Sequence, residues 1–147
     1  MPRWLPLKHR DDPAVQRDLN WARGGAGDHL PAGLEVQWLG TAGFRLTYEG
    51  TTLLIDPYVS RAPLVAVARQ RRPLHADAGL VADLLPAADA VLLGHTHFDH
   101  AIDAAAVAAA HGCPVFGSSS AQHLLALHGR PDLAVAVEPH RPYEIGP

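Results

Sequence analysis

The sequence has little of the chemistry on which several protein classes depend. Cys113 is its single cysteine, which excludes a disulfide within the chain and suits a reducing compartment. It contains no run of 18 uncharged apolar residues, and the first residues have no apolar signal core. The formal net charge of -3 at pH 7 argues against a nucleic-acid partner bound through overall positive charge. We therefore expect a soluble, cytoplasmic protein with no membrane partner.

The composition is that of a folded domain. Of the 147 residues, 48% are hydrophobic and 18% are charged, which is typical of a globular chain long enough to bury a core. Residues 1–33 are set apart by four prolines and four glycines, and we expect an N-terminal arm that packs on the outside. A flexible leader is the alternative for this segment. Residues 34–147 form the predicted domain.

Hydrophobic periodicity predicts strands first and then alternating strands and helices. Glu49-Gly50 is a hairpin signal, Asp77 is a candidate N-cap, and Ser119 with Gln122 has the spacing of a capping box. Strands are expected within residues 34–38, 44–48, 51–55, 90–93, 114–116, 133–137 and 143–145, and helices within 63–68, 77–85, 102–110 and 119–127. This order indicates a layered α/β domain.

One short stretch carries most of the chemistry. Residues 94–100 read Gly-His-Thr-His-Phe-Asp-His and directly follow the apolar run of residues 90–93. Neutral imidazole is a good zinc ligand, and a carboxylate can complete a ligand set. His95 and His97 project to the same side of an extended backbone, while Asp99 and His100 can face a second position beside them. The alternative is a polar loop whose histidines only cap helix ends and contact solvent.

The pattern His95-x-His97-x-Asp99-His100 resembles the signature of the metallo-β-lactamase superfamily of metallohydrolases. Residues 36–44 and 53–57 are similar to the opening strands of that family, and the branch containing L-ascorbate-6-phosphate lactonase is the most similar one. The resemblance implies the N-terminal half of a four-layer αβ/βα sandwich, with a mixed sheet and helices on one face. It also implies a small-molecule substrate.

The resemblance further implies up to two Zn²⁺ ions, with Mn²⁺ or Fe²⁺ as alternatives. His95 and His97 would hold one ion, and Asp99 and His100 the other. Asp56, at the end of an apolar strand, would lie near the site without being a principal ligand, or would only form a turn. Zinc lowers the pKa of bound water from ~15.7 toward ~7, and Asp99 is suited to bind this water as the catalytic carboxylate. The expected reaction is hydrolysis of a lactone, phosphodiester, thioester or amide.

The ligand set is short for this chemistry. A catalytic zinc normally has three protein ligands, whereas each ion here has two. His140 is the only late histidine, and its setting of residues 138–142 is typical of a turn. The family supplies its further ligands beyond this region, so we expect a domain that is incomplete at its C-terminus. The missing half or a homodimer would complete the site; a non-catalytic fragment that binds metal weakly and pairs with another chain is the alternative.

A small basic cluster precedes residues 94–100. Arg69, Arg71 and Arg72 could attract an anionic substrate, because guanidinium groups match the geometry of phosphate and carboxylate. A solvated face is the alternative for these side chains.

Overall fold

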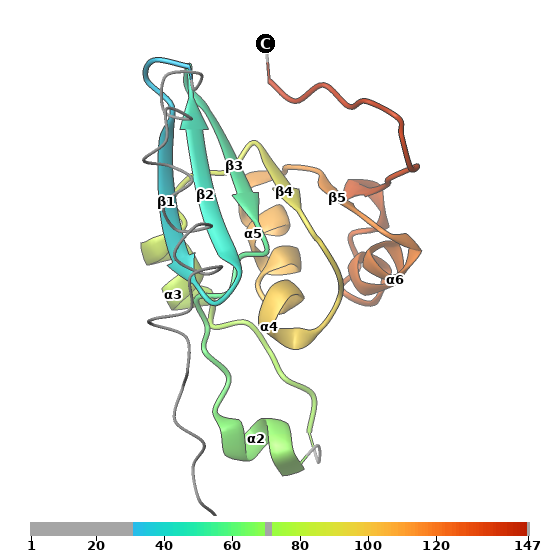
Figure 1. The fold of residues 1–147 in the computed structure, drawn as a ribbon. Coiled ribbons are helices and arrows are strands. Elements are labelled where there is room, and N and C mark those ends of the chain that lie inside the picture. The colour runs from blue at the N-terminus through green and yellow to red at the C-terminus, as the bar shows by residue number, and fades with distance from the viewer. Residues whose placement is uncertain (1–30, 70–71, 147) are drawn as a thin grey trace, which may run out of the picture. The chain divides into compact units, whose positions relative to one another are not determined.

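The computed structural model describes residues 31–69 and 72–146 of the chain (Figure 1). Residues 1–30, which hold most of the predicted N-terminal arm, lie outside the described residues. The strands are β1 (Glu35–Gly40), β2 (Gly43–Tyr48), β3 (Thr51–Ile55), β4 (Ala90–Leu92), β5 (Val115–Gly117) and β6 (Ala134–Ala136). The helices are α2 (Leu64–Arg69), α3 (Ala78–Leu84), α4 (Phe98–Ala101), α5 (Ala104–His111), α6 (Ser119–Leu127) and the 3-10 turn η3 (Pro131–Leu133).

The six strands form one mixed sheet in sequence order. Strands β1, β2 and β3 are antiparallel, and β3 to β6 run parallel to one another. The predicted hairpin joins β2 to β3 through Glu49 and Gly50, whose φ angles of 47° and 81° are the positive values that a type I′ turn requires. The parallel strands are connected through helices, as parallel pairing demands.

One face of the sheet carries the core. Leu54, Val91 and Val115 are register neighbours on β3, β4 and β5, and all three are fully buried. They join one apolar cluster with residues of α3, α5 and α6, including Val107 and Leu125. Figure 1 shows α5 behind β4. The predicted α/β fold, with a mixed sheet and helices on one face, is therefore confirmed.

The opposite face, which we call the open face, is apolar and partly exposed. A row of cross-strand neighbours runs over all six strands: Trp38, Phe44, Ile55, Leu92, Phe116 and Val135. Trp38 is 66% exposed and Val36, on the same face of β1, is 55% exposed. The expectation that these strands are half-buried is wrong for β1, because no element within residues 31–69 and 72–146 buries these two side chains.

The predicted helix over residues 102–110 is found as α5, but it begins two residues later than expected. The chain forms α4 inside the metal motif, turns at Ile102 and Asp103, and continues as α5 to Gly112, a left-handed C-cap at φ 65°. Asp103 is the N-cap of α5, and its buried carboxylate binds backbone of the loop that follows β3. Asp99 and His100 consequently lie on α4.

Two smaller predictions fail at the ends of elements. The N-cap of α6 is Ser118, and its side chain makes no capping hydrogen bond, so the proposed capping box at Ser119 does not form. Residues 143–145 are not a strand. The Tyr143 hydroxyl instead donates to the carbonyl of Ala136, and its ring contacts Phe116. The Asp77 N-cap, by contrast, is confirmed, with its carboxylate accepting from the N–H of Leu80.

Within the described part of the chain, no helix has the length and apolarity needed to cross a membrane. The cytoplasmic location stays a prediction of the sequence.

Candidate metal centre

The predicted site residues come from two neighbouring strands of the sheet. Asp56 directly follows β3, and the metal loop, which we define as residues 94–100, begins two residues after β4. The strands are parallel and in register, and the N–H of Asp56 donates to the carbonyl of Leu92 at 3.0 Å. Because the carboxyl ends of parallel strands meet at one edge, such an edge is where α/β folds bind ligands. The local fold therefore delivers Asp56 and the metal loop to the same place.

Three imidazole rings gather in the metal loop. The ring centroid of His95 lies 4.5 Å from that of His97 and 3.9 Å from that of His100. The rings of His95 and His97 are exposed, while the side chain of His100 is 15% exposed. Asp99 is the fourth predicted ligand, and its Oδ2 lies 3.8 Å from Nε2 of His100. The rings of His97 and His100 thus both lie close to His95, and Asp99 lies near His100.

Asp56 links the metal loop to β3 through both carboxylate oxygens. Oδ1 accepts a hydrogen bond from the N–H of Gly94 at 2.8 Å, and Oδ2 lies 2.9 Å from Nδ1 of His100. A neutral His100 that donates from Nδ1 keeps the lone pair of Nε2 for a metal. The backbone of Asp56 has a φ of 44°, a left-handed conformation that aspartate tolerates better than most residues. These contacts place Asp56 where it can orient His100.

The donor types suit zinc, but the arrangement is incomplete. Imidazole and carboxylate are the ligands of catalytic zinc sites. Among the residues that the structure describes, however, no group of three or more His, Cys, Asp or Glu side chains is placed to hold one ion. The cluster therefore supplies the chemistry of a metal site without a closed set of three ligands.

The four histidines that follow the metal loop have other surroundings. His111 is hydrogen-bonded through Nε2 to the carbonyl of Leu85 at 2.9 Å, so it ties α5 to the end of α3. His123 and His128 are exposed on and just after α6, and His140 is exposed with a φ of 64°. None of the four contacts the metal loop through a described hydrogen bond.

Two residues beside the loop escaped sequence reasoning. Asp103 is a fully buried carboxylate, and Tyr58 packs edge-on against Phe98, with ring centroids 6.0 Å apart. The sequence held one signal for the first of them: Asp103 is the only charged residue in the apolar stretch from 101 to 110. Nothing in the sequence pointed to Tyr58, because its partner lies 40 positions away.

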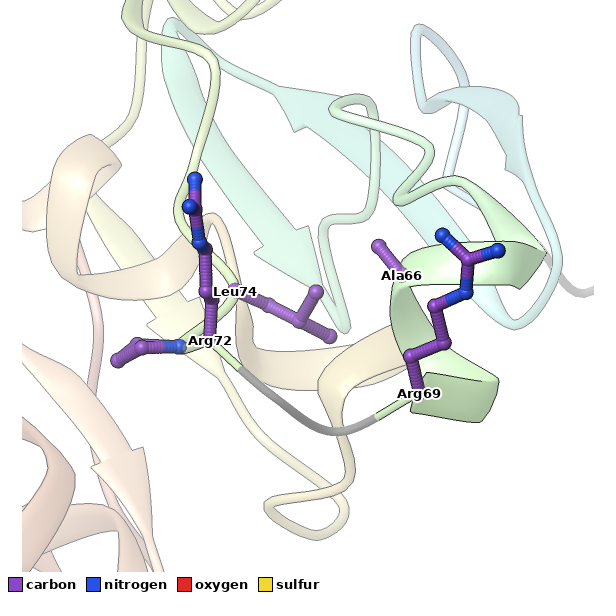
Figure 2. Close-up of a pocket in the computed structure, with 5 residues that line it drawn as sticks. Ala66, Arg69, Arg72 and Leu74 are labelled. Atoms are coloured by element: carbon purple, nitrogen blue, oxygen red, sulfur yellow. The ribbon is translucent and has the colours of Figure 1, made fainter.

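The basic cluster borders a pocket of about 310 Å³, which is lined by Ala66, Arg69, Arg72, Pro73 and Leu74 (Figure 2). Arg69 and Arg72 enter it from α2 and from the segment that leads away from α2. Leu74 also lines a neighbouring pocket of about 190 Å³, together with Thr96 and Phe98 of the metal loop. Arg71 lies outside the described residues.

Comparisons with known proteins point to one family. The family model described as a beta-lactamase superfamily domain matches residues 35–139. A UPF0173 metal-dependent hydrolase of Cereibacter sphaeroides is 33% identical over 84 residues, which are 57% of this chain and 32% of that protein. A UPF0173 metal-dependent hydrolase of Pyrobaculum neutrophilum is 33% identical over 85 residues, 58% of this chain and 32% of that protein.

A solved structure of a metallo hydrolase from Ignicoccus hospitalis aligns with a TM-score of 0.48 at 17% identity, covering 76% of this chain and 42% of that one. The chain spans about a third of the length of the curated relatives it matches. The family model, in contrast, covers most of this chain and the whole metal loop. The chain therefore belongs to the metallo-β-lactamase superfamily.

Proposed function

We propose that this chain carries the metal-binding part of a metal-dependent hydrolase that cleaves an ester-like bond: a lactone, phosphodiester, thioester or amide. The observation that carries the proposal is the cluster of His95, His97, Asp99 and His100 at one strand end. The names of the two relatives, both metal-dependent hydrolases, support the same reaction class.

Each residue of the cluster has a definite part in this proposal. His95 and His97 would hold one ion, and Asp99 and His100 a second, with Zn²⁺ preferred over Mn²⁺ or Fe²⁺. Bound zinc supplies a Lewis acid and a water of lowered pKa. Asp99 would accept a hydrogen bond from the water that such an ion supplies, since an ionised carboxylate only accepts. Asp56 holds the ring of His100 so that Nε2 faces Asp99.

The remaining ligands would come from outside the described residues. Each ion needs at least one further protein donor, because the described side chains do not close around a point. The rest of a longer polypeptide would provide them, with a second sheet packed on the open face. If the chain acts without further polypeptide, a homodimer formed through the open face would provide the missing ligands.

A second candidate function follows from the same shortage of ligands. The chain would then be a non-catalytic subunit that binds metal weakly and pairs with another chain. The observation that favours it is the absence of a three-donor group among the described residues. Catalysis by the purified chain separates the two functions.

The experiment compares the 147-residue chain with Asp99→Asn and with Asp83→Asn, an exposed carboxylate on α3. Each protein is loaded with zinc and assayed on p-nitrophenyl acetate, bis(p-nitrophenyl) phosphate and a simple lactone. We expect zinc-dependent hydrolysis of at least one probe, lowered at least a hundredfold by Asp99→Asn and unchanged by Asp83→Asn.

Bound zinc without hydrolysis would favour the non-catalytic subunit. A chain that binds no zinc at all would contradict both functions.

A further inference from the structure

We propose that Asp103 is a positioning residue for the metal loop. Its carboxylate fixes the segment of residues 58–61 after β3, and the Tyr58 ring of that segment holds Phe98 in place. Phe98 lies between the predicted ligands His97 and Asp99, so the inference rests on the proposed function of this loop.

The contacts of Asp103 are all made to one segment. Its Oδ2 accepts hydrogen bonds from the N–H groups of Val59 at 2.6 Å and Ser60 at 2.9 Å. Its Oδ1 accepts from the hydroxyl of Ser60. Asp103 is 0% exposed, and no Lys or Arg among the described residues forms an ion pair with it. The carboxylate of Asp103 therefore holds this segment, and hydrogen bonds, not a cation, offset the cost of burying its charge.

Stability alone gives a poor reason for such a residue. Removing a carboxylate from water costs several kcal/mol, and here only hydrogen bonds from Val59 and Ser60 offset that cost, because no described cation pairs with Asp103. The alanines around Asp103 show that this part of α5 packs well with small apolar residues. What the carboxylate adds is a fixed geometry for the segment that it binds.

That geometry reaches the metal loop through aromatic contacts. Tyr58 meets Phe98 edge to face, with an interplanar angle of 83°. The guanidinium of Arg61 also lies near this ring, 4.9 Å from its centroid. Arg61 is itself tied down, because it donates to the carbonyl of Leu39 at 2.6 Å and to the hydroxyl of Thr41 at 2.7 Å. The ring of Tyr58 thus contacts both Phe98 and Arg61, and Arg61 is bonded to the end of β1 and the turn between β1 and β2.

A second branch of the network connects to α3. The Ser60 hydroxyl, which donates to Asp103, accepts from the N–H of Asp77 at 2.6 Å. Asp77 in turn caps α3. A residue that only stabilised the fold would act through this branch, so the test must separate a general loss of stability from loosening of the metal loop.

The first test is Asp103→Asn, which keeps the size of the side chain but removes its charge and part of its accepting capacity. Its control is Val107→Ala, a fully buried residue of α5, which weakens the core but leaves the carboxylate of Asp103 and its hydrogen bonds in place. We expect Asp103→Asn to speed amide hydrogen exchange across residues 94–100 in the metal-free protein, and to weaken Co²⁺ binding about tenfold or more with a changed visible spectrum. Val107→Ala lowers Tm but leaves exchange in the metal loop and the cobalt spectrum as in the wild type.

Equal effects of the two variants on metal-loop exchange would overturn the inference. If Asp103→Asn does not fold, Tyr58→Leu decides, because it leaves the hydrogen bonds of Asp103 in place and removes only the aromatic contact. Unchanged exchange across residues 94–100 in Tyr58→Leu would equally overturn it. Failure of the wild type to bind Co²⁺ would refute the proposed function, while the exchange measurement on the metal-free chain would still decide the role of Asp103.

Discussion

Asp56 illustrates what a single residue can do at a strand end. Its sequence context, an aspartate before Pro57, suited both a turn and a residue that orients the metal loop. In the structure its φ is positive, and its carboxylate meets both Gly94 and His100. Sequence reasoning could not choose, since these partners lie 38 and 44 positions away and no local pattern specifies them.

We predict that Asp56→Ala weakens metal binding by roughly 10- to 100-fold, because the ring of His100 loses the group that orients it. Competition with a chromogenic chelator measures the change. Asp89→Ala is the matched control, since Asp89 also accepts a hydrogen bond from a strand backbone, the N–H of Thr52, but at the opposite end of β3. Wild-type affinity in Asp56→Ala would show that His100 is positioned by other contacts.

Cys113 is a buried thiol. Burial raises the pKa of this thiol above its ordinary value, and the carboxylate of Asp89 acts in the same direction. We therefore expect very slow alkylation by iodoacetamide at pH 8 and fast alkylation in urea, with mass spectrometry as the readout. Fast alkylation of the native chain would show that the thiol is accessible.

The raised pKa of Cys113 also sets the direction in which the free energy of unfolding changes with pH. The unfolded chain ionises Cys113 at a lower pH than the folded chain does. The contribution of the buried thiol is therefore complete below the unfolded pKa and decreases as the pH rises through it.

At the scale of elements, strands and helices with strong periodicity were predicted nearly to the residue. The errors fall where a long-range contact overrides local propensity. The alanine-rich stretch forms the continuous helix α5, but this helix begins two residues later than predicted, after Asp103, whose carboxylate binds residues 59 and 60. The sequence could reveal the odd carboxylate in that stretch but not its partners.

Helix α6 approaches β5 closely, and Gly117 makes this approach possible. A Cβ at Gly117 would lie 2.7 Å from Cβ of Ala121 and 3.4 Å from Cβ of Leu93. We expect Gly117→Ala to destabilise the fold by about 1–3 kcal/mol, because both neighbours are packed in the core. Thermal unfolding measures the loss, and the exposed Ser120→Ala on α6 is the control. An unchanged Tm would mean that α6 shifts freely.

At the scale of the whole molecule, the sequence predicted the mixed sheet, the one-sided helices and the family through its metal motif. It could not predict how the ligands are arranged, because their directions depend on contacts between β3, the metal loop and α5. The same holds for the open face. Alternating apolar residues in β1 and β2 indicate a face that another element covers, but they do not identify that element.

We predict that the isolated chain self-associates through the open face. Trp38→Gln should shift sedimentation velocity profiles toward monomer with little change in Tm, since Trp38 is 66% exposed. Leu127→Gln is the control, because Leu127 is an exposed apolar residue on α6, away from that face. A wild-type chain that stays monomeric at every concentration, or an equal effect of both variants, would contradict association through this face.

The central claim is that the side chains of residues 95–100 bind a divalent metal. X-ray diffraction from zinc-soaked crystals, recorded on both sides of the zinc absorption edge, tests it most directly. The account predicts an anomalous peak about 2.0–2.2 Å from ring nitrogens of His95 and His97 or from Asp99 and His100. An ordered metal loop with no peak among these four side chains would contradict the account.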